Sequence, residues 1–247
     1  MRVSEFFERF FLVRRCAACG ELLPYERRDE AFCAECRMRW DVEKTRECPA
    51  CGRAVCECIC MTKSLSKAGA LCHRKAVFYS SSRAVPHRTL MFIKRNNNPR
   101  VTAFLAHELA AVLRADKTLP EICADNCVIT FVPRGRGAVA KYGLDQSELL
   151  SRALSKEMGI PAATAFRRKR GGKEQKRLDA NERARNVKEL FEPTRGLSEL
   201  VGGKRIILVD DIVTTGSSMA VCISYLTRAG ARETVCLSIA TTEHEKK

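Results

Sequence analysis

The 247-residue chain contains no long apolar run. No stretch reaches the ~18 uninterrupted apolar residues needed to cross a bilayer, which excludes a membrane-spanning protein. The stretch from residue 6 to residue 12 is rich in phenylalanine, but charged residues interrupt it. It lacks the apolar core of a signal peptide and is expected to be a short amphipathic helix. These absences predict a soluble, cytoplasmic protein with no membrane insertion.

Aromatic residues are also scarce, at 6% of the chain. Base stacking needs aromatic platforms, and the candidates near the cysteines are Trp40 and Tyr25, so a sequence-specific nucleic-acid reader is not expected. Positive charge, in contrast, is plentiful. The formal net charge is +15, which favours polyanionic partners such as phosphorylated metabolites or the backbone of single-stranded DNA.

Cysteine is abundant and unevenly placed, with nine of the fourteen residues between positions 16 and 60. Three Cys-x2-Cys pairs occur, and this spacing lets two thiolates reach one tetrahedral ion. A disulfide framework is not expected in a reducing cytosol. The sequence therefore predicts one or two structural zinc ions. The candidate ligands are Cys16, Cys19, Cys33, Cys36, Cys48, Cys51, Cys56, Cys58 and Cys60.

The last three of these cysteines are irregularly spaced. All three cannot join a closed four-thiolate site that already holds Cys48 and Cys51, so the choice among them stays open. The segment from residue 1 to residue 65 has few large apolar side chains, and metal ligation is expected to supply its stability. No open coordination position with a general base is evident. The sequence thus predicts a small zinc-ribbon-like module rather than a zinc hydrolase.

Residues 206–219 read Ile-Ile-Leu-Val-Asp-Asp-Ile-Val-Thr-Thr-Gly-Ser-Ser-Met. An apolar run of strand length ends in Asp210 and Asp211, and a helical pattern follows Gly216. Carboxylates at the end of a strand suit a ribose diol or hydrated Mg²⁺. Backbone N–H groups and hydroxyls at a helix start can hold a phosphate. The unit predicts a sugar-phosphate site.

This unit resembles the signature of type I phosphoribosyltransferases, which bind 5-phosphoribosyl-1-pyrophosphate (PRPP). The resemblance implies that Asp210 and Asp211 hold the ribose. It assigns the 5-phosphate to Thr214, Thr215, Gly216 and Ser217. Purine-salvage members carry an acidic base three residues after the second acid. Thr214 stands there in this chain, so a hypoxanthine or guanine mechanism is disfavoured.

A second loop follows the apolar run 128–132 and is rich in glycine and arginine. Such a loop can present N–H groups and cations to a pyrophosphate, and its candidates are Arg134, Arg136 and Lys141. Apolar runs at residues 76–80 and 235–240 predict further strands. Helices are expected over residues 88–93, 101–113 and 149–158, and after Gly216.

The order of the motifs is similar to that of ComF-type proteins, the competence-associated ComFC/GntX group. Those proteins combine cysteine knuckles, a Val-Pro strand end, an Arg-Gly-Phe-Asn-Gln box, a basic loop with Gln, an Arg-x-x-Asn box and the acidic signature. The matching residues here are Val132, Pro133, Gln175, Arg183, Asn186 and Lys94. One box departs: residues 142–146 read Tyr-Gly-Leu-Asp-Gln, so Tyr142 and Asp145 replace the Arg and Asn.

Together these features predict an α/β protein: a zinc module at residues 1–65 and a type I phosphoribosyltransferase domain at residues 66–247, with a mainly parallel twisted sheet flanked by helices. The expected activity is pentosyl transfer from Mg²⁺·PRPP to an unidentified acceptor. The resemblance implies a link to DNA uptake and competence-machinery proteins. Two alternatives stay open, a non-catalytic single-stranded DNA-binding factor and a PRPP-sensing regulator. The sequence does not determine the oligomeric state.

Overall fold

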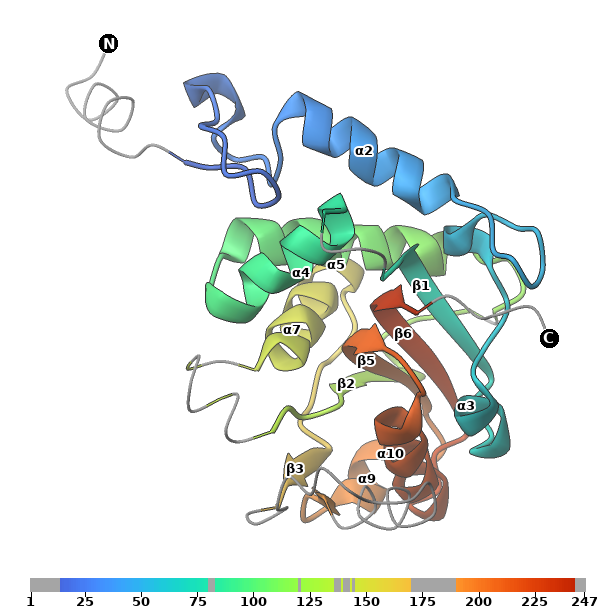
Figure 1. Cartoon of the computed structure of the whole chain (residues 1–247). Coiled ribbons are helices and arrows are strands. Elements are labelled where there is room, and N and C mark those ends of the chain that lie inside the picture. Colours follow the sequence, from blue (N-terminus) through green and yellow to red (C-terminus); the bar gives the residue numbers. More distant parts are fainter. Residues whose placement is uncertain are drawn as a thin grey trace, which may run out of the picture.

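A four-stranded parallel sheet in the order β1-β6-β5-β2 forms the centre of the computed structural model (Figure 1). The structure describes residues 14–79, 83–119, 121–135, 139, 143, 145–169 and 190–242. All four expected strands are present with somewhat different bounds, and the predicted fold class is confirmed. The strands are β1 (Cys72–Phe78), β2 (Cys127–Phe131), β5 (Arg205–Val213) and β6 (Glu233–Thr241).

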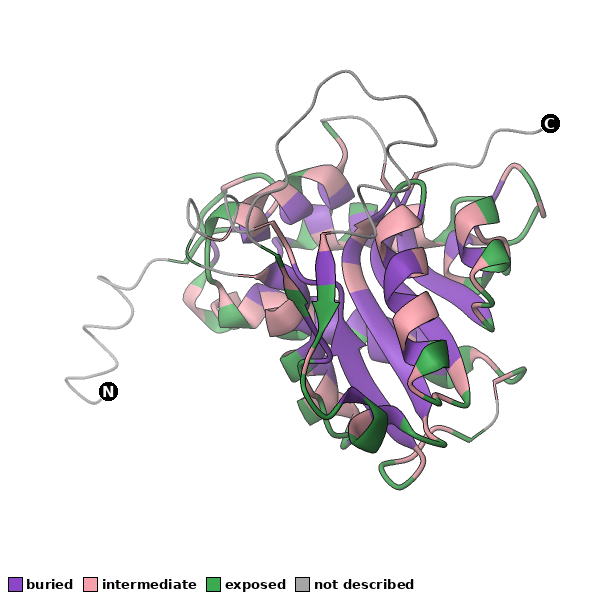
Figure 2. Ribbon diagram, turned by 90° about the horizontal axis from the view of Figure 1, so that it is seen from below, coloured by how far each residue is buried: buried purple, intermediate pink, exposed green. Residues whose placement is uncertain are grey.

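Successive residues of each strand face opposite sides of the sheet, and both sides are covered. On β5, Ile207 and Val209 pack into one apolar cluster, and Ile206 and Leu208 pack into the other. The strands are therefore buried along nearly their whole length (Figure 2). This explains their continuous apolar runs, because a parallel sheet covered on both faces has no polar side.

Helices α4, α5 and α7 lie on one side of the sheet, and α3, α9 and α10 lie on the other (Figure 1). Local signals set their ends: Asn98 caps α5 by accepting the N–H of Val101 at 3.2 Å, and Gly159 ends α7 at φ 69°. The helices are α3 (Lys63–Lys67), α4 (Val85–Arg95), α5 (Pro99–Ala115), α7 (Gln146–Met158), α9 (Leu197–Val201) and α10 (Ser217–Arg228).

The cysteine-rich segment packs directly on this body through α2 (Ala34–Thr45). Phe32 and Trp40 contact the ring of Phe104 at centroid distances of 4.9 and 5.4 Å. Beside them, the buried carboxylate of Glu108 accepts the indole N–H of Trp40 at 3.2 Å and pairs with Lys44. Removing one partner of such a buried pair is costly, so Glu108 fixes the module on α5.

Four short elements complete the described chain. A two-stranded antiparallel ribbon lies beside the sheet (Figure 1), and two 3₁₀ turns lie in the cysteine-rich segment. The elements are β3 (Phe166–Arg168), β4 (Phe191–Pro193), η1 (Tyr25–Arg27) and η2 (Val55–Glu57). The expected helix at residues 6–12 lies outside the described residues. Among those that are described, no helix is long and apolar enough to cross a bilayer.

Candidate phosphoribosyl site and cysteine clusters

The acidic pair lies at the carboxyl edge of the sheet. β2 pairs with β5 only as far as Val209, whereas β6 continues alongside β5 to Val213. Asp210 and Asp211 therefore still belong to β5, which runs further than expected because its other neighbour is longer. Parallel strands bind ligands at this edge, and the structure places the predicted acids there.

The two carboxylates have different surroundings. Asp210 Oδ1 accepts the hydroxyl of Ser147 at 3.1 Å and the N–H of Asp211 at 2.9 Å. Asp211 is 8% exposed, and its Oδ1 accepts the N–H of Ile212 at 2.8 Å. Its buried Oδ2 has no hydrogen-bond donor among the described groups, and the Nζ of Lys94 lies 3.6 Å away. An oxygen in this condition suits a sugar hydroxyl or a hydrated Mg²⁺.

Burial raises the pKa of Asp210 well above its ordinary value, and the adjacent Asp211 carboxylate raises it further. The N–H of Asp211 and the hydroxyl of Ser147 act in the opposite direction. Asp210 therefore holds a proton more tightly than an ordinary carboxyl does, because two adjacent carboxylates repel each other when both are charged. A ligand that donates hydrogen bonds or carries positive charge would relieve this repulsion.

The predicted phosphate loop connects β5 to α10. Asp210 and residues 212–219 line a small hollow. Gly216 is the N-cap of α10 with φ 76°, and the hydroxyls of Thr215 and Ser217 lie 2.9 Å apart at the helix start. The first N–H groups of a helix have no partner within it, so this loop can hold a phosphate through backbone donors.

Residues 142–146 form the box that departs from the ComF-type pattern, and its last two residues, Asp145 and Gln146, have a structural role. Asp145 caps α7 by accepting the N–H groups of Ser147 and Glu148, and its other oxygen accepts the N–H of Arg134 at 2.7 Å. Burial raises the pKa of Asp145, although these donors oppose the change. The Arg134 side chain donates to Gln146, which donates in turn to the Ile93 carbonyl at 3.0 Å. Arg134 is thus tied to α7 at the edge of the site.

Two site residues come from distant helices. Lys94, in the last turn of α4, was noted only through the family resemblance, and the structure brings it to Asp211. Ser147, near the start of α7, was not predicted. Its hydroxyl reaches Asp210 from 63 residues away in the sequence, and no local pattern marks such a contact.

Arg168 also lies near the site. In the sequence it is one member of a dense basic run, and nothing there distinguishes it from its neighbours. This half-buried residue ends β3, and its guanidinium stacks on Phe191 at 5.4 Å from the ring centroid. A Cβ at Gly135 would lie 3.7 Å from its Cζ, so the guanidinium adjoins the glycine-rich loop. Burial lowers the pKa of Arg168, while Asp145 and Asp210 oppose that change. Among the described residues, no carboxylate lies within ion-pairing distance of it.

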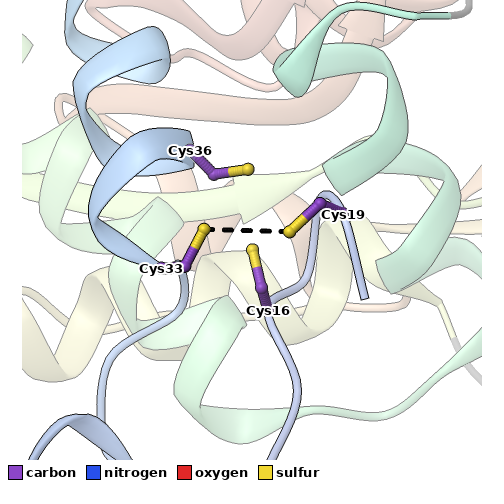
Figure 3. Close-up of side chains that lie close together, drawn as sticks. All are labelled: Cys16, Cys19, Cys33 and Cys36. Carbon is purple, nitrogen blue, oxygen red and sulfur yellow. Dashed lines mark hydrogen bonds between the residues drawn. The ribbon is translucent and has the colours of Figure 1, made fainter. Parts of the chain in front are cut away.

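The first cysteine cluster consists of Cys16, Cys19, Cys33 and Cys36, whose side chains point toward one another (Figure 3). The four Sγ atoms lie within 4.8 Å of one another, and those of Cys19 and Cys33 are 3.7 Å apart. Four thiolates about 2.3 Å from a tetrahedral zinc lie about 3.8 Å apart. The cluster therefore fits such an ion.

The second cysteine cluster consists of Cys48, Cys51, Cys58 and Cys60, also within 4.8 Å. Its first pair repeats the turn of the first cluster: Gly52 donates to the Cys48 carbonyl at 2.8 Å, as Gly20 does to Cys16 at 3.0 Å. Both glycines have positive φ. Cys56 lies outside both clusters and packs against the main apolar core instead.

Each cluster contains one thiol whose pKa is lowered. Although burial opposes the change, backbone N–H donors lower the pKa of Cys16 to about 7. In the second cluster burial again opposes it, but the N–H of Arg53 and neighbouring thiols lower the pKa of Cys51 to about 7. Thiolate is the form that binds metal, so each site is prepared for a cation.

Several predicted residues lie outside the described part of the chain. Among them are two cations of the glycine-rich loop and the members of the basic loop and of the Arg-x-x-Asn box. They are Arg136, Lys141, Tyr142, Gln175, Arg183 and Asn186.

The sheet, its carboxyl-edge acids and the loop before α10 define a class of protein. Residues 138–247 match the family described as the phosphoribosyl transferase domain. This part of the chain is therefore a phosphoribosyltransferase-type domain. A solved adenine phosphoribosyltransferase is 21% identical, covers 61% of this chain and 75% of its own, and has a TM-score of 0.38. The class rests on the matched domain and the sheet, not on this low score.

Relatives found by sequence similarity point to a smaller group within this class of protein. The chain is 35% identical over 124 residues to the DNA utilization protein YhgH of Escherichia coli strain K12. The aligned region covers 50% of this chain and 52% of the relative. It is 33% identical over 94 residues to competence protein F of Haemophilus influenzae, covering 38% and 41%. The resemblance to ComF-type proteins is confirmed. The chain spans about half the length of the curated relatives it matches, or less.

We expect Asp210→Asn to stabilise the ligand-free protein at neutral pH. A carboxyl with a raised folded-state pKa keeps its proton longer in the folded chain. The fold is then most stable below the unfolded pKa near 3.8 and loses stability as the pH rises toward the folded-state value. Removing that cost should raise the Tm at pH 7 by about 2–4 °C, measured by calorimetry.

The gain should shrink at pH 4 and below, where the wild-type carboxyl regains its proton. The exposed Asp125→Asn serves as the control and should show no such pH dependence. A lower Tm for Asp210→Asn at pH 7 would contradict the proposed charge repulsion.

Proposed function

We propose that this protein binds Mg²⁺·PRPP at the carboxyl edge of its sheet and transfers the phosphoribosyl group to an acceptor. The observation that carries the proposal is the buried Asp211 oxygen without a donor, next to Asp210 and directly before the loop at the start of α10. Ribose hydroxyls would supply the missing donors. The 5-phosphate would sit on residues 214–217.

The reaction would displace pyrophosphate from the anomeric carbon. The acceptor forms a bond to that carbon and loses a proton, and the carbon–oxygen bond to pyrophosphate breaks, with the electron pair leaving on pyrophosphate. Mg²⁺, held with the ligand, would offset the phosphate charge. Arg168 would face the departing group. This is supported by its guanidinium, which adjoins the glycine-rich loop and lacks a described carboxylate partner.

The proposal predicts that the two halves of PRPP respond to different residues. The Asp210→Asn, Asp211→Asn double variant should lose Mg²⁺·PRPP binding in calorimetric titration. Arg168→Met should weaken Mg²⁺·PRPP about 10- to 100-fold, the usual effect of losing a charged hydrogen bond. It should leave ribose 5-phosphate, which lacks the pyrophosphate, nearly unchanged.

Arg167→Met is the matched control, because Arg167 precedes Arg168 on the same strand and is exposed. It should bind both ligands as wild type does. Equal losses for the two ligands in Arg168→Met would remove Arg168 from the pyrophosphate site. No binding of PRPP by folded wild-type protein would refute the proposed function itself.

We also propose zinc as the ion of both cysteine clusters, because four thiolates at tetrahedral spacing are a usual structural zinc site. The prediction is two zinc ions per chain by elemental analysis. Cys58→Ser should reduce the content toward one, whereas Cys56→Ser should retain two, since Cys56 lies outside the clusters. The reverse pattern would show that Cys56 rather than Cys58 is a ligand.

A role with single-stranded DNA is a second proposal, favoured by the names of the relatives, a DNA utilization protein and a competence protein, and by the net charge of +15. Contacts to the DNA backbone release counterions, so affinity should fall steeply with salt. Titration of a labelled single strand between about 50 and 200 mM salt tests this, with an expected loss of about 10³-fold for six phosphate contacts. An affinity independent of salt would exclude backbone binding.

A further inference from the structure

Helix α3 connects the second cysteine cluster to the core beside α10. It begins at Lys63, three residues after Cys60. Thr62 is its N-cap, and the Thr62 hydroxyl accepts the N–H of Leu65 at 3.4 Å. Leu65 is completely buried and belongs to the same apolar cluster as Met219 and Cys222 of α10. A segment of the cysteine-rich part thus reaches the helix that follows the phosphate loop.

The contact continues to the loop itself at Gly216. A Cβ built on this glycine would lie 2.5 Å from Thr62 Oγ1 and 2.9 Å from Leu65 Cγ. Both distances are too short for any side chain, so the loop backbone lies flush against α3. Gly216 also needs its positive φ to start α10. The place of Thr62 therefore limits where Gly216 can lie.

The opposite end of the same segment is fixed by sulfur atoms and by β1. Cys58 and Cys60 are members of the second cysteine cluster, against which the fully buried Phe78 packs. Lys75, also fully buried on β1, donates its ammonium to the Cys60 carbonyl. A buried ammonium requires negative charge nearby, and a metal with four thiolates carries a net negative charge.

We propose that metal bound at the second cysteine cluster positions the phosphate loop through Thr62 and Leu65. Without an ion, the four thiols have no common centre to hold them, so Cys58 and Cys60 lose their fixed spacing and Thr62 is released from Gly216. Thr62 and Leu65 are positioning residues that touch no ligand. The consequence for PRPP rests on the proposed function, whereas the mechanical link does not.

Hydrogen exchange of the ligand-free protein tests the link. The amide of Ala220 donates to the Gly216 carbonyl at 2.9 Å and reports the first turn of α10. Opening the second cluster with Cys58→Ser and Cys60→Ser should speed its exchange and weaken ribose 5-phosphate about tenfold or more, as loss of support around a site does. The control, Cys16→Ser with Cys19→Ser, opens the first cluster and should change neither. Equal effects of the two pairs, or no effect of either, would overturn the proposal.

A second pair of variants leaves every thiol in place. Thr62→Val keeps the side-chain volume but removes the acceptor that caps α3, and Thr62→Ser retains the acceptor. Thr62→Val should speed Ala220 exchange and weaken ribose 5-phosphate about fivefold, the effect of losing an N-cap. Thr62→Ser should restore both, and the metal content should be unchanged in each. An unchanged Ala220 in Thr62→Val would overturn the role of Thr62.

The exchange measurement separates the two proposals. If wild-type protein binds neither PRPP nor ribose 5-phosphate while Ala220 still responds to the second cluster, the proposed function fails and the link stands. If the ligands bind but Ala220 is indifferent to the second cluster, the link fails and the proposed function stands.

Discussion

The central position of β5 is the constraint on which the site depends. β5 is hydrogen-bonded to β2 on one side and to β6 on the other, and both faces are covered by helices. Its register is therefore fixed, since a slip by one residue would turn its apolar side chains away from their clusters. Asp210 and Asp211 belong to β5 and are therefore held in place with it. The loop before α10 follows directly from this fixed strand.

Holding two carboxylates side by side on a rigid strand is electrostatically unfavourable, and the residues of the site offset this only in part. Burial raises the pKa of Asp210, the adjacent Asp211 raises it further, and Lys94 is the described cation within ion-pairing distance of Asp211. Structural ion pairs elsewhere are better matched, as between Arg205 and Glu233. An unbalanced pair at the edge of a rigid sheet is typical of a binding site, where the ligand completes the electrostatics.

Local patterns predicted the fold and part of the site from the sequence. The acidic pair, the hydroxyl loop and the Cys-x2-Cys pairs are short, contiguous motifs whose geometry follows from the backbone. Contacts between distant elements could not be predicted. Neither the contact of Ser147 with Asp210 nor that of Thr62 with Gly216 leaves a local pattern in the sequence. The choice between Cys56 and its neighbours likewise depended on the path of the chain after Cys51. Asp145 looked like a loss of a family residue, yet it serves as a helix cap.

The two cysteine clusters differ in how much of the chain must be synthesised before their surroundings can form. All four thiols of the first cluster precede residue 37. The walls of the second include Lys75 and Phe78 on β1, and β1 pairs with β6, from Cys72 beside Val235 to Phe78 beside Thr241. A chain synthesised from its amino end must therefore finish β6 before that wall exists. Damage to the carboxyl-terminal strand would accordingly appear as a defect among cysteines near the beginning of the protein.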